Sequence, residues 1–152
     1  MPNWCSNTVV LQHSDPAMIT RAAEALRGDT LFAEFVPLGG DGLHGWNYDL
    51  AVENWGTKWD ISNADIIDQY DNSVSASYET AWAPPIAFYD RLVEMGFEVH
   101  ASYFEPGMGF TGKYMDGEDE EYEIDPEDLS NIPEDLMEAY GIDEMYEDWD
   151  AD

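Results

Sequence analysis

The sequence predicts an α+β fold in which two amphipathic helices pack on an antiparallel sheet. Segments of strand character and helical segments follow one another in the order strand, helix, two or more strands, helix, strand. With 152 residues, of which 44% are hydrophobic and 14% aromatic, the chain is long enough to bury one core and too short for two ordinary domains. We therefore expect a single packed core.

The first two elements are a strand and a helix. Residues 6–13 carry apolar and β-branched side chains that are typical of a strand. Asp15 directly precedes Pro16, an arrangement typical of a helix N-cap and first turn, and Gly28 is a stop signal. The apolar residues that recur between them at helical spacing are Met18, Ile19, Ala22, Ala23 and Leu26.

The middle of the chain is less regular. Residues 31–36 have the composition of a short strand, which Pro37 would end. Residues 46–52 fit a helix or a strand, and residues 54–60 are predicted to form a compact aromatic loop.

A hairpin, a second helix and a further strand follow. Residues 65–70 and 73–80 alternate on either side of the turn-prone pair Asp71-Asn72, which predicts a β-hairpin. The second helix begins at Pro84-Pro85 and ends before Gly96. Its buried side is predicted to hold Ile86, Tyr89, Leu92, Val93 and Met95. With a strand over residues 97–104, this order predicts a ferredoxin-like antiparallel sheet with two helices on one face.

Charge divides the chain after residue 114. Residues 1–114 contain 16 acidic and five basic side chains, whereas residues 115–152 contain 18 acidic side chains and no Lys or Arg. We therefore predict a ferredoxin-like α+β domain over residues 1–114 and an acidic C-terminal extension over residues 115–152, docked on that domain. A last hairpin, residues 109–114 paired with 121–124, would join the two.

The extension is predicted to contain short amphipathic helices. Asn131, Pro133 and Glu134 resemble a helix start, and Gly141 resembles a helix end. Beyond it, apolar residues recur on one helical face: Ile142, Met145, Tyr146 and Trp149. This stripe either docks on the protein's own domain, the interpretation that we favour, or binds a partner.

The net charge of −29 indicates the class of partner. Concentrated carboxylates repel nucleic acid and anionic membranes, and they attract basic protein surfaces. The predicted partner-binding surface consists of Asp116, Glu118, Asp119, Glu120, Glu121, Glu123, Asp125, Glu127, Asp128, Asp143, Glu144, Glu147 and Asp148. Two alternatives stay open: adaptation of the surface to high salt, or an acidic surface kept for solubility.

No residue pattern predicts a catalytic, cofactor or metal site. The three histidines lie apart in the sequence, and one cysteine cannot supply the paired ligands of a zinc site. The acidic run that begins at Asp116 does not fit the EF-hand template, because Gly117 is the second residue of the run and the template needs glycine at the sixth. Cys5 is predicted to be a small buried thiol rather than a nucleophile.

The expected location is the cytoplasm. A single cysteine fits a reducing compartment, and no apolar run has the length of a membrane span or the pattern of a signal peptide. The sequence leaves the oligomeric state open.

The loop over residues 54–60 is the best site-like feature outside the extension. An indole face can hold a cation or a sugar. The candidate aromatic pocket consists of Trp55, Lys58, Trp59, Asp60 and Trp82. The alternative, which the density of tryptophan favours, is that these side chains fill a core and hold the loop closed.

Four segments, in this order, are similar to the YubB ferredoxin-like domain family, whose members are encoded by plasmids and phages. They are MPNWCSN at 1–7, NWGTKWD at 54–60, TAWAPP at 80–85 and YFEPGMGFTG at 103–112. The resemblance spans roughly residues 1–114. It implies a ferredoxin-like fold, no established catalytic residue, and an accessory role for a mobile element, such as countering host defence.

These observations together predict a non-enzymatic, mobile-element-encoded protein that binds a basic, nucleic-acid-binding host protein and no nucleic acid or membrane directly. Duplex DNA presents a charge about every 3.4 Å along each strand, so an array of carboxylates can occupy the same basic groove and act as a DNA mimic against a defence system. The alternatives are a small-ligand or enzymatic module that uses the loop at 54–60, and an acidic housekeeping domain of a halophile.

Overall fold

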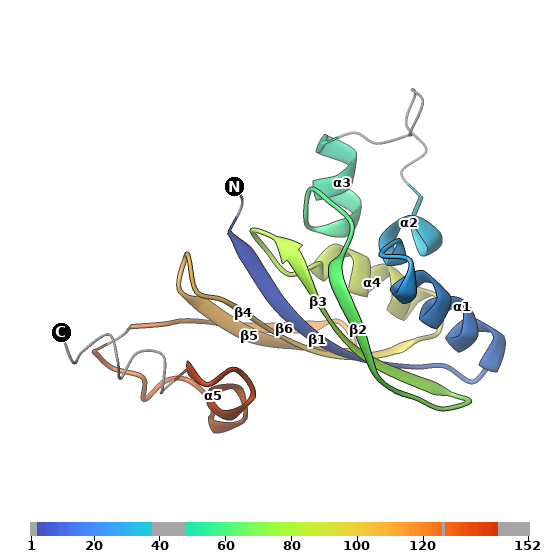
Figure 1. Ribbon diagram of the computed structural model, residues 1–152. Coiled ribbons are helices and arrows are strands. Elements are labelled where there is room, and N and C mark those ends of the chain that lie inside the picture. Colours follow the sequence, from blue (N-terminus) through green and yellow to red (C-terminus); the bar gives the residue numbers. More distant parts are fainter. Residues whose placement is uncertain (1–2, 38–47, 126, 143–152) are drawn as a thin grey trace.

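The computed structural model describes residues 3–37, 48–125 and 127–142, which form an α+β fold as predicted (Figure 1). The strands are β1 (Trp4–Gln12), β2 (Ser62–Gln69), β3 (Ser73–Ala81), β4 (Glu98–Glu105), β5 (Phe110–Met115) and β6 (Glu118–Glu123). The helices of the described residues are α1 (Pro16–Arg27), α2 (Leu31–Phe35), α3 (Tyr48–Trp55), α4 (Ile86–Glu94) and α5 (Glu134–Tyr140). None of these helices is long and apolar enough to cross a membrane.

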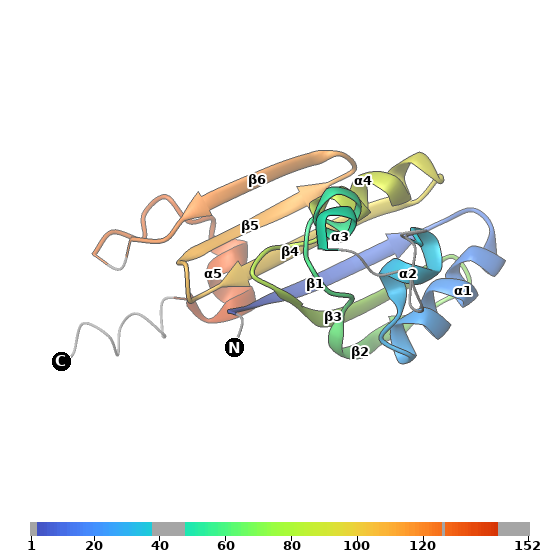
Figure 2. The same cartoon turned by 90° about the horizontal axis from the view of Figure 1, so that it is seen from above.

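All six strands belong to one antiparallel sheet in the order β2-β3-β1-β4-β5-β6. Helices α1 to α4 lie on one face of this sheet and α5 lies on the other (Figures 1 and 2). Helix α1 follows β1 and precedes β2, and α4 connects β3 to β4, so each of these crossovers passes over one intervening strand. Strands β2 and β6 form the two edges.

The main core lies between the sheet and helices α1 to α4. Val9 and Leu11 of β1 are buried in it, while Val10 and Gln12 between and after them are exposed, as expected for a strand with one covered face. The Phe32 ring is fully buried, and its centroid lies 4.6 Å from that of Phe88. Burial of such large apolar side chains supplies most of the driving force for folding.

The first helix is confirmed as α1. Asp15 has an extended backbone, and its side chain accepts a hydrogen bond of 3.0 Å from the Ala17 N–H. Pro16 occupies the first turn, where the missing N–H has no partner to lose. The second helix and the strand after it are likewise confirmed as α4 and β4, and β2 and β3 form the hairpin predicted around Asp71-Asn72.

The prediction of a strand over residues 31–36 is wrong, because residues 31–35 form α2. The cause lies far along the chain: the Asp60 carboxylate accepts hydrogen bonds of 2.9 Å from the Phe32 and Ala33 N–H groups and so satisfies donors of the first helical turn. Tertiary contacts override the strand propensity of this segment. The ambiguous segment that reaches residue 52 is helical from residue 48 onward.

The last hairpin is present, but its predicted bounds are wrong. Strands β5 and β6 are joined by two residues only, Asp116 and Gly117, rather than by residues 115–120. Both turn residues have positive φ, 47° and 108°, as a type I′ turn requires. The Asp-Gly pair is a typical signal for this turn. It was not recognised because it begins a run of six acidic or turn-forming residues, 116–121, which resembled a longer loop.

Residues 124–142 pack on the sheet face that α1 to α4 leave open. Helix α5 starts after Pro133 and ends at Gly141, which has the left-handed φ of 60°, as predicted. Tyr140 Oη lies 2.9 Å from Ser102 Oγ on β4. The buried apolar residues of this contact are Phe104, Ile124, Ile132, Leu136 and Ile142. Met145, Tyr146 and Trp149 of the predicted stripe lie outside the described residues.

Candidate functional site

Six residues of the predicted acidic surface lie on one β-hairpin, which we call the acidic hairpin. They are Asp116, Glu118, Asp119, Glu120, Glu121 and Glu123, and all are exposed. The last five occupy β6, an edge strand whose pairing with β5 continues without a bulge from Glu118 to Glu123. Because side chains alternate along a strand, Asp119, Glu121 and Glu123 project toward the α4 side, and Glu118 and Glu120 toward the α5 side.

The carboxylates on the α4 side of β6 repel one another and the nearby Asp90. Burial raises the pKa of Asp119, and Asp90 on α4 raises it further, while a 2.6 Å hydrogen bond from Tyr103 Oη opposes both effects. Burial also raises the pKa of Glu121, and repulsion from Asp119 and Glu123 adds to it. In the described part of the chain, no salt bridge to Lys or Arg neutralises these carboxylates. A cationic partner would therefore relieve unfavourable charge at this surface.

Each of the five Lys and Arg side chains contacts a residue outside the acidic hairpin. Lys113 is the one that lies on the β5–β6 hairpin, as the register partner of Glu120, and its Nζ is 3.4 Å from Asp135 Oδ2. The remaining four, with their partners, are Arg21 with Glu34, Arg27 with Gln69, Lys58 over the ring of Trp59, and Arg91 with Asn54. The acidic hairpin thus keeps most of its charge available for a partner.

Asp125, Glu127 and Asp128, the other predicted acids that the structure describes, lie on the loop after β6 and not on the acidic hairpin. Asp125 Oδ1 accepts from the Glu127 N–H at 3.0 Å, and Asp128 Oδ1 accepts from the Ser130 N–H and Oγ. The Ser130 hydrogen bonds lower the pKa of Asp128. Asp125 and Asp128 therefore stabilise their own loop. Asp143, Glu144, Glu147 and Asp148 lie outside the described residues.

The five residues of the candidate aromatic pocket have different roles in the structure. Trp55 is 4% exposed, and its Nε1–H donates to the Val36 carbonyl at 2.8 Å. Asp60 serves as the cap of α2; burial raises its pKa, and three backbone hydrogen bonds oppose that shift. Trp55 and Asp60 are therefore committed to the core and to the helix start.

The remaining members of this set lie at the surface. Lys58 Nζ is 4.2 Å from the centroid of the Trp59 ring, a cation–π contact. Trp59 is 40% exposed and lies 6.3 Å, centroid to centroid, from Trp4. Trp82 is 44% exposed and has a positive φ of 71°. None of the five lines the cleft beside the β2–β3 turn that is described below.

Replacing Asp60 with alanine is expected to lower the free energy of unfolding by about 2 kcal/mol, because the backbone N–H groups of Phe32, Ala33 and Ile61 lose their acceptor. Urea unfolding would measure the change. Glu53→Ala, at an exposed position of α3, is the matched control and is expected to change stability by under about 0.5 kcal/mol. Equal stability of the two variants would contradict the capping role.

Cys5 is fully buried, as predicted. Burial, together with the nearby Glu105, raises the pKa of its thiol to about 12. The side chain therefore remains a thiol at neutral pH and is not an activated nucleophile. Glu105 is itself buried and accepts hydrogen bonds from the Gly107 and Met108 N–H groups at 2.7 and 2.6 Å, which closes the turn after β4. Among the described side chains, no group of three or more His, Cys, Asp or Glu could hold a metal ion.

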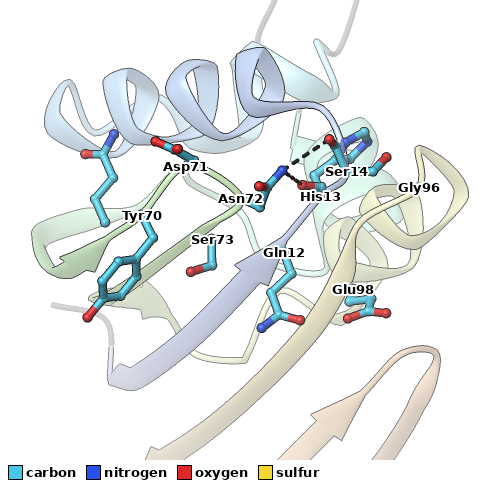
Figure 3. A pocket seen from close by; sticks show the side chains of 10 residues that line it. Gln12, His13, Ser14, Tyr70, Asp71, Asn72, Ser73, Gly96 and Glu98 are labelled. Carbon is cyan, nitrogen blue, oxygen red and sulfur yellow. Dashed lines mark hydrogen bonds between the residues drawn. The ribbon is translucent and has the colours of Figure 1, made fainter.

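A cleft of about 860 Å³ lies at the end of the sheet where β1 and β2 end and β3 and β4 begin (Figure 3). His13 lies at its margin with both ring nitrogens occupied. Its Nδ1 accepts from the Asp15 N–H at 3.0 Å, so its Nε2–H is the donor to the Met95 carbonyl at 3.0 Å. The imidazole therefore ties β1 to the end of α4 and is not a free base.

No sequence motif predicts a site here: Asp71 and Asn72 were predicted only as turn residues, and Gly96 only as a helix end. The cleft is lined by Gln12, His13, Ser14, Gln69, Tyr70, Asp71, Asn72, Ser73, Gly96 and Glu98. The strand pattern does place Gln12, Ser73 and Glu98 at strand ends, but only the strand order makes them neighbours. Asp90 and Tyr103, which contact the acidic hairpin, were missed for the same reason.

No family model matches the chain, and no curated protein matches it. Among solved structures, it is similar to a crystal structure of protein api92 from Yersinia pseudotuberculosis, assigned to the DUF1281 family. The two are 20% identical with a TM-score of 0.45, and the similarity covers 63% of this chain and 40% of that chain. The chain thus spans less than half the length of the api92 chain.

Proposed function

We propose that this protein is a non-enzymatic binding protein whose acidic hairpin engages a basic surface of a nucleic-acid-binding host protein. In this role it would act as a DNA mimic that inhibits a host defence complex. The observation that carries the proposal is the run of carboxylates on the exposed edge strand β6. Those on its α4 side have no salt bridge to Lys or Arg among the described residues.

The spacing of these carboxylates suits a nucleic-acid site. A strand rises about 3.4 Å per residue, so Glu118 to Glu121 place one carboxylate at each rise, alternately on the two sides of β6. Carboxylates on the same side are therefore about 6.8 Å apart, which matches every second axial step of the phosphates along one DNA strand. Pairing with β5 holds β6 in place along its whole length. Because the array is already ordered, binding would cost less conformational entropy than ordering a flexible acidic tail.

The proposal includes a ferredoxin-like fold, supported by the order β2-β3-β1-β4 and by the positions of α1 and α4 on one face. The acidic extension, residues 115–152, would then begin at the turn before β6 and dock through α5. The resemblance of residues 1–114 to the YubB family makes a plasmid or phage the proposed origin, and the host cytoplasm is the proposed location.

Competition with DNA tests the proposal. The purified protein would be added to restriction and CRISPR-type complexes that hold a fluorescently labelled duplex, and anisotropy would report displacement. We expect displacement at about 50 mM salt that weakens steeply toward about 200 mM, since charge contacts dominate. If the protein displaced the duplex from none of these complexes at low salt, the proposal would be refuted. Cooperative melting without molar salt would separate it from the halophile alternative.

The affinity for the basic partner is expected to rise with pH across the mildly acidic range. In the free protein the pKa values of Asp119 and Glu121 are raised above their ordinary values of 3.8 and 4.5, so each holds its proton to a higher pH. A cationic partner binds the ionised form, and binding must release these protons at the lower end of that range. Calorimetry at pH about 5 in two buffers of different ionisation enthalpy would detect the release. Affinity that rises on acidification would contradict this mechanism.

A further inference from the structure

Four side chains form a row across the sheet within the cleft of Figure 3. The Tyr70 N–H donates to the Ser73 carbonyl at 2.8 Å, Ser73 is the register partner of Gln12, and Gln12 is the register partner of Glu98. Register partners share a face, and the figure shows all four side chains on the same side of the ribbon. Neighbouring strands are about 4.8 Å apart, so the row is about 14 Å long.

The turns around this row are tied together by hydrogen bonds. Asn72 Nδ2 donates to the carbonyls of His13 and Ser14 at 2.9 and 3.1 Å, which fixes the β2–β3 turn to the end of β1 (Figure 3). His13 fixes the same segment to Met95 at the end of α4. A site that is already ordered loses little conformational entropy when a ligand binds.

The row itself is left available for a ligand. Within the described residues, no side-chain hydrogen bond or salt bridge engages Tyr70, Ser73, Gln12 or Glu98, whereas His13 and Asn72 are engaged. Tyr70 is two-thirds exposed, and Gln12 and Glu98 are exposed as well.

The chemistry of the cleft favours a cation. Glu98 offers only acceptors, and Asp71 on the adjoining turn adds a second negative charge. No Lys or Arg is among the lining residues; Arg27 reaches the margin, where it donates to Gln69 Oε1 at 2.8 Å. The Tyr70 ring can hold a cation against its face. An anionic ligand would meet these carboxylates and the field of a chain with net charge −29.

We propose that this cleft binds a linear aliphatic polyamine. One ammonium group would bind Glu98, the chain would lie along the Gln12 amide and the Ser73 hydroxyl, and a second ammonium group would contact the Tyr70 ring. The length of the row and its alternation of charged, polar and aromatic groups suit an extended molecule with amine groups separated by methylenes. This site is separate from the acidic hairpin and does not depend on the function proposed for it.

Titration of the full chain with spermidine at about 150 mM salt tests the proposal, because this ionic strength screens loose binding to exposed charge. Calorimetry is expected to show one saturable site per chain. Gln12→Ala and Tyr70→Leu leave the net charge unchanged and are expected to weaken binding about threefold to fivefold each. Glu98→Gln is expected to weaken it about tenfold. Circular dichroism melts would confirm that each variant is folded.

Glu53→Gln on α3 is the matched control, because it removes the same charge at an exposed position away from the cleft. It is expected to bind spermidine like the unmodified protein. Equal loss in Glu53→Gln and Glu98→Gln, with no effect of Gln12→Ala, would mean unspecific counterion binding and would overturn the proposal. The proposal would also be overturned if the protein bound a trilysine peptide in a Gln12-dependent way but did not bind spermidine. In that case the cleft would bind the lysine side chain of a partner protein. Cleft variants are expected to displace DNA normally, so the two proposals fail separately.

Discussion

Replacing Gly112 with valine is expected to lower the free energy of unfolding by about 4 kcal/mol. Gly112 is a buried residue of β5, and the phenol of Tyr103 crosses it to donate to Asp119 Oδ1 on β6. A Cβ at this position would overlap both the Tyr103 phenol and the Glu120 carbonyl oxygen. The carbonyl belongs to the paired backbone of β6, so relief would require the acidic hairpin to shift.

Urea unfolding followed by circular dichroism would measure this effect. Gly28→Ala is the matched control, because Gly28 has an ordinary φ of −94° and an added Cβ would meet Thr30 Oγ1 at a normal contact distance of 3.5 Å. The control is expected to change stability by under about 0.5 kcal/mol. An unchanged unfolding midpoint for Gly112→Val would mean that Tyr103 does not cross β5 toward the acidic hairpin.

Conversion of the five carboxylates of β6 to amides is expected to weaken binding to the basic partner by at least about 100-fold at low salt. The variant carries Glu118→Gln, Asp119→Asn, Glu120→Gln, Glu121→Gln and Glu123→Gln. Amides keep the size of the side chains, and the backbone pairing of β6 with β5 does not use them. Since each charge contact contributes to the salt dependence of a nucleic-acid-like interface, the slope of affinity against salt should also fall.

A control variant with the same change in net charge separates the surface from the total charge. It converts five exposed acids elsewhere to amides: Glu24, Asp49, Glu53, Asp68 and Glu94. This control is expected to displace labelled duplex DNA from the partner within about threefold of the unmodified protein, because distant exposed charges are screened. Equal loss of displacement in the two variants would show that net charge, and not the acidic hairpin, determines binding.

Local signals account for the elements that the sequence predicts correctly. Asp15 and Pro16 start α1 through contacts within three residues, and Asp71-Asn72 joins two alternating strands directly. The segment at 31–35 has no such signal, because its helix is capped by Asp60, some 28 residues later. Its apolar composition therefore indicated a strand when read alone.

The candidate sites likewise depend partly on local composition and partly on contacts between distant residues. Composition predicted where the carboxylates concentrate, but not that Lys113 would contact Asp135 while Asp119, Glu121 and Glu123 project to the other side of β6. The tryptophans of the loop at 54–60 suggested a pocket, whereas the fold buries Trp55 against Val36 and leaves Trp59 at the surface. Proximity in sequence did not predict a shared environment.

Local sequence signals are sufficient to predict the α+β class and the helix starts that depend on local caps, and composition gives the excess of negative charge in residues 115–152. The strand order and register, in contrast, place Tyr70, Ser73, Gln12 and Glu98 side by side. They also leave Asp119, Glu121 and Glu123 without a salt bridge to Lys or Arg among the described residues. The difference arises from the distance along the chain over which the interactions act. Caps, turns and hydrophobic periodicity act over a few residues, whereas strand order and register depend on burying one face of every strand at the same time.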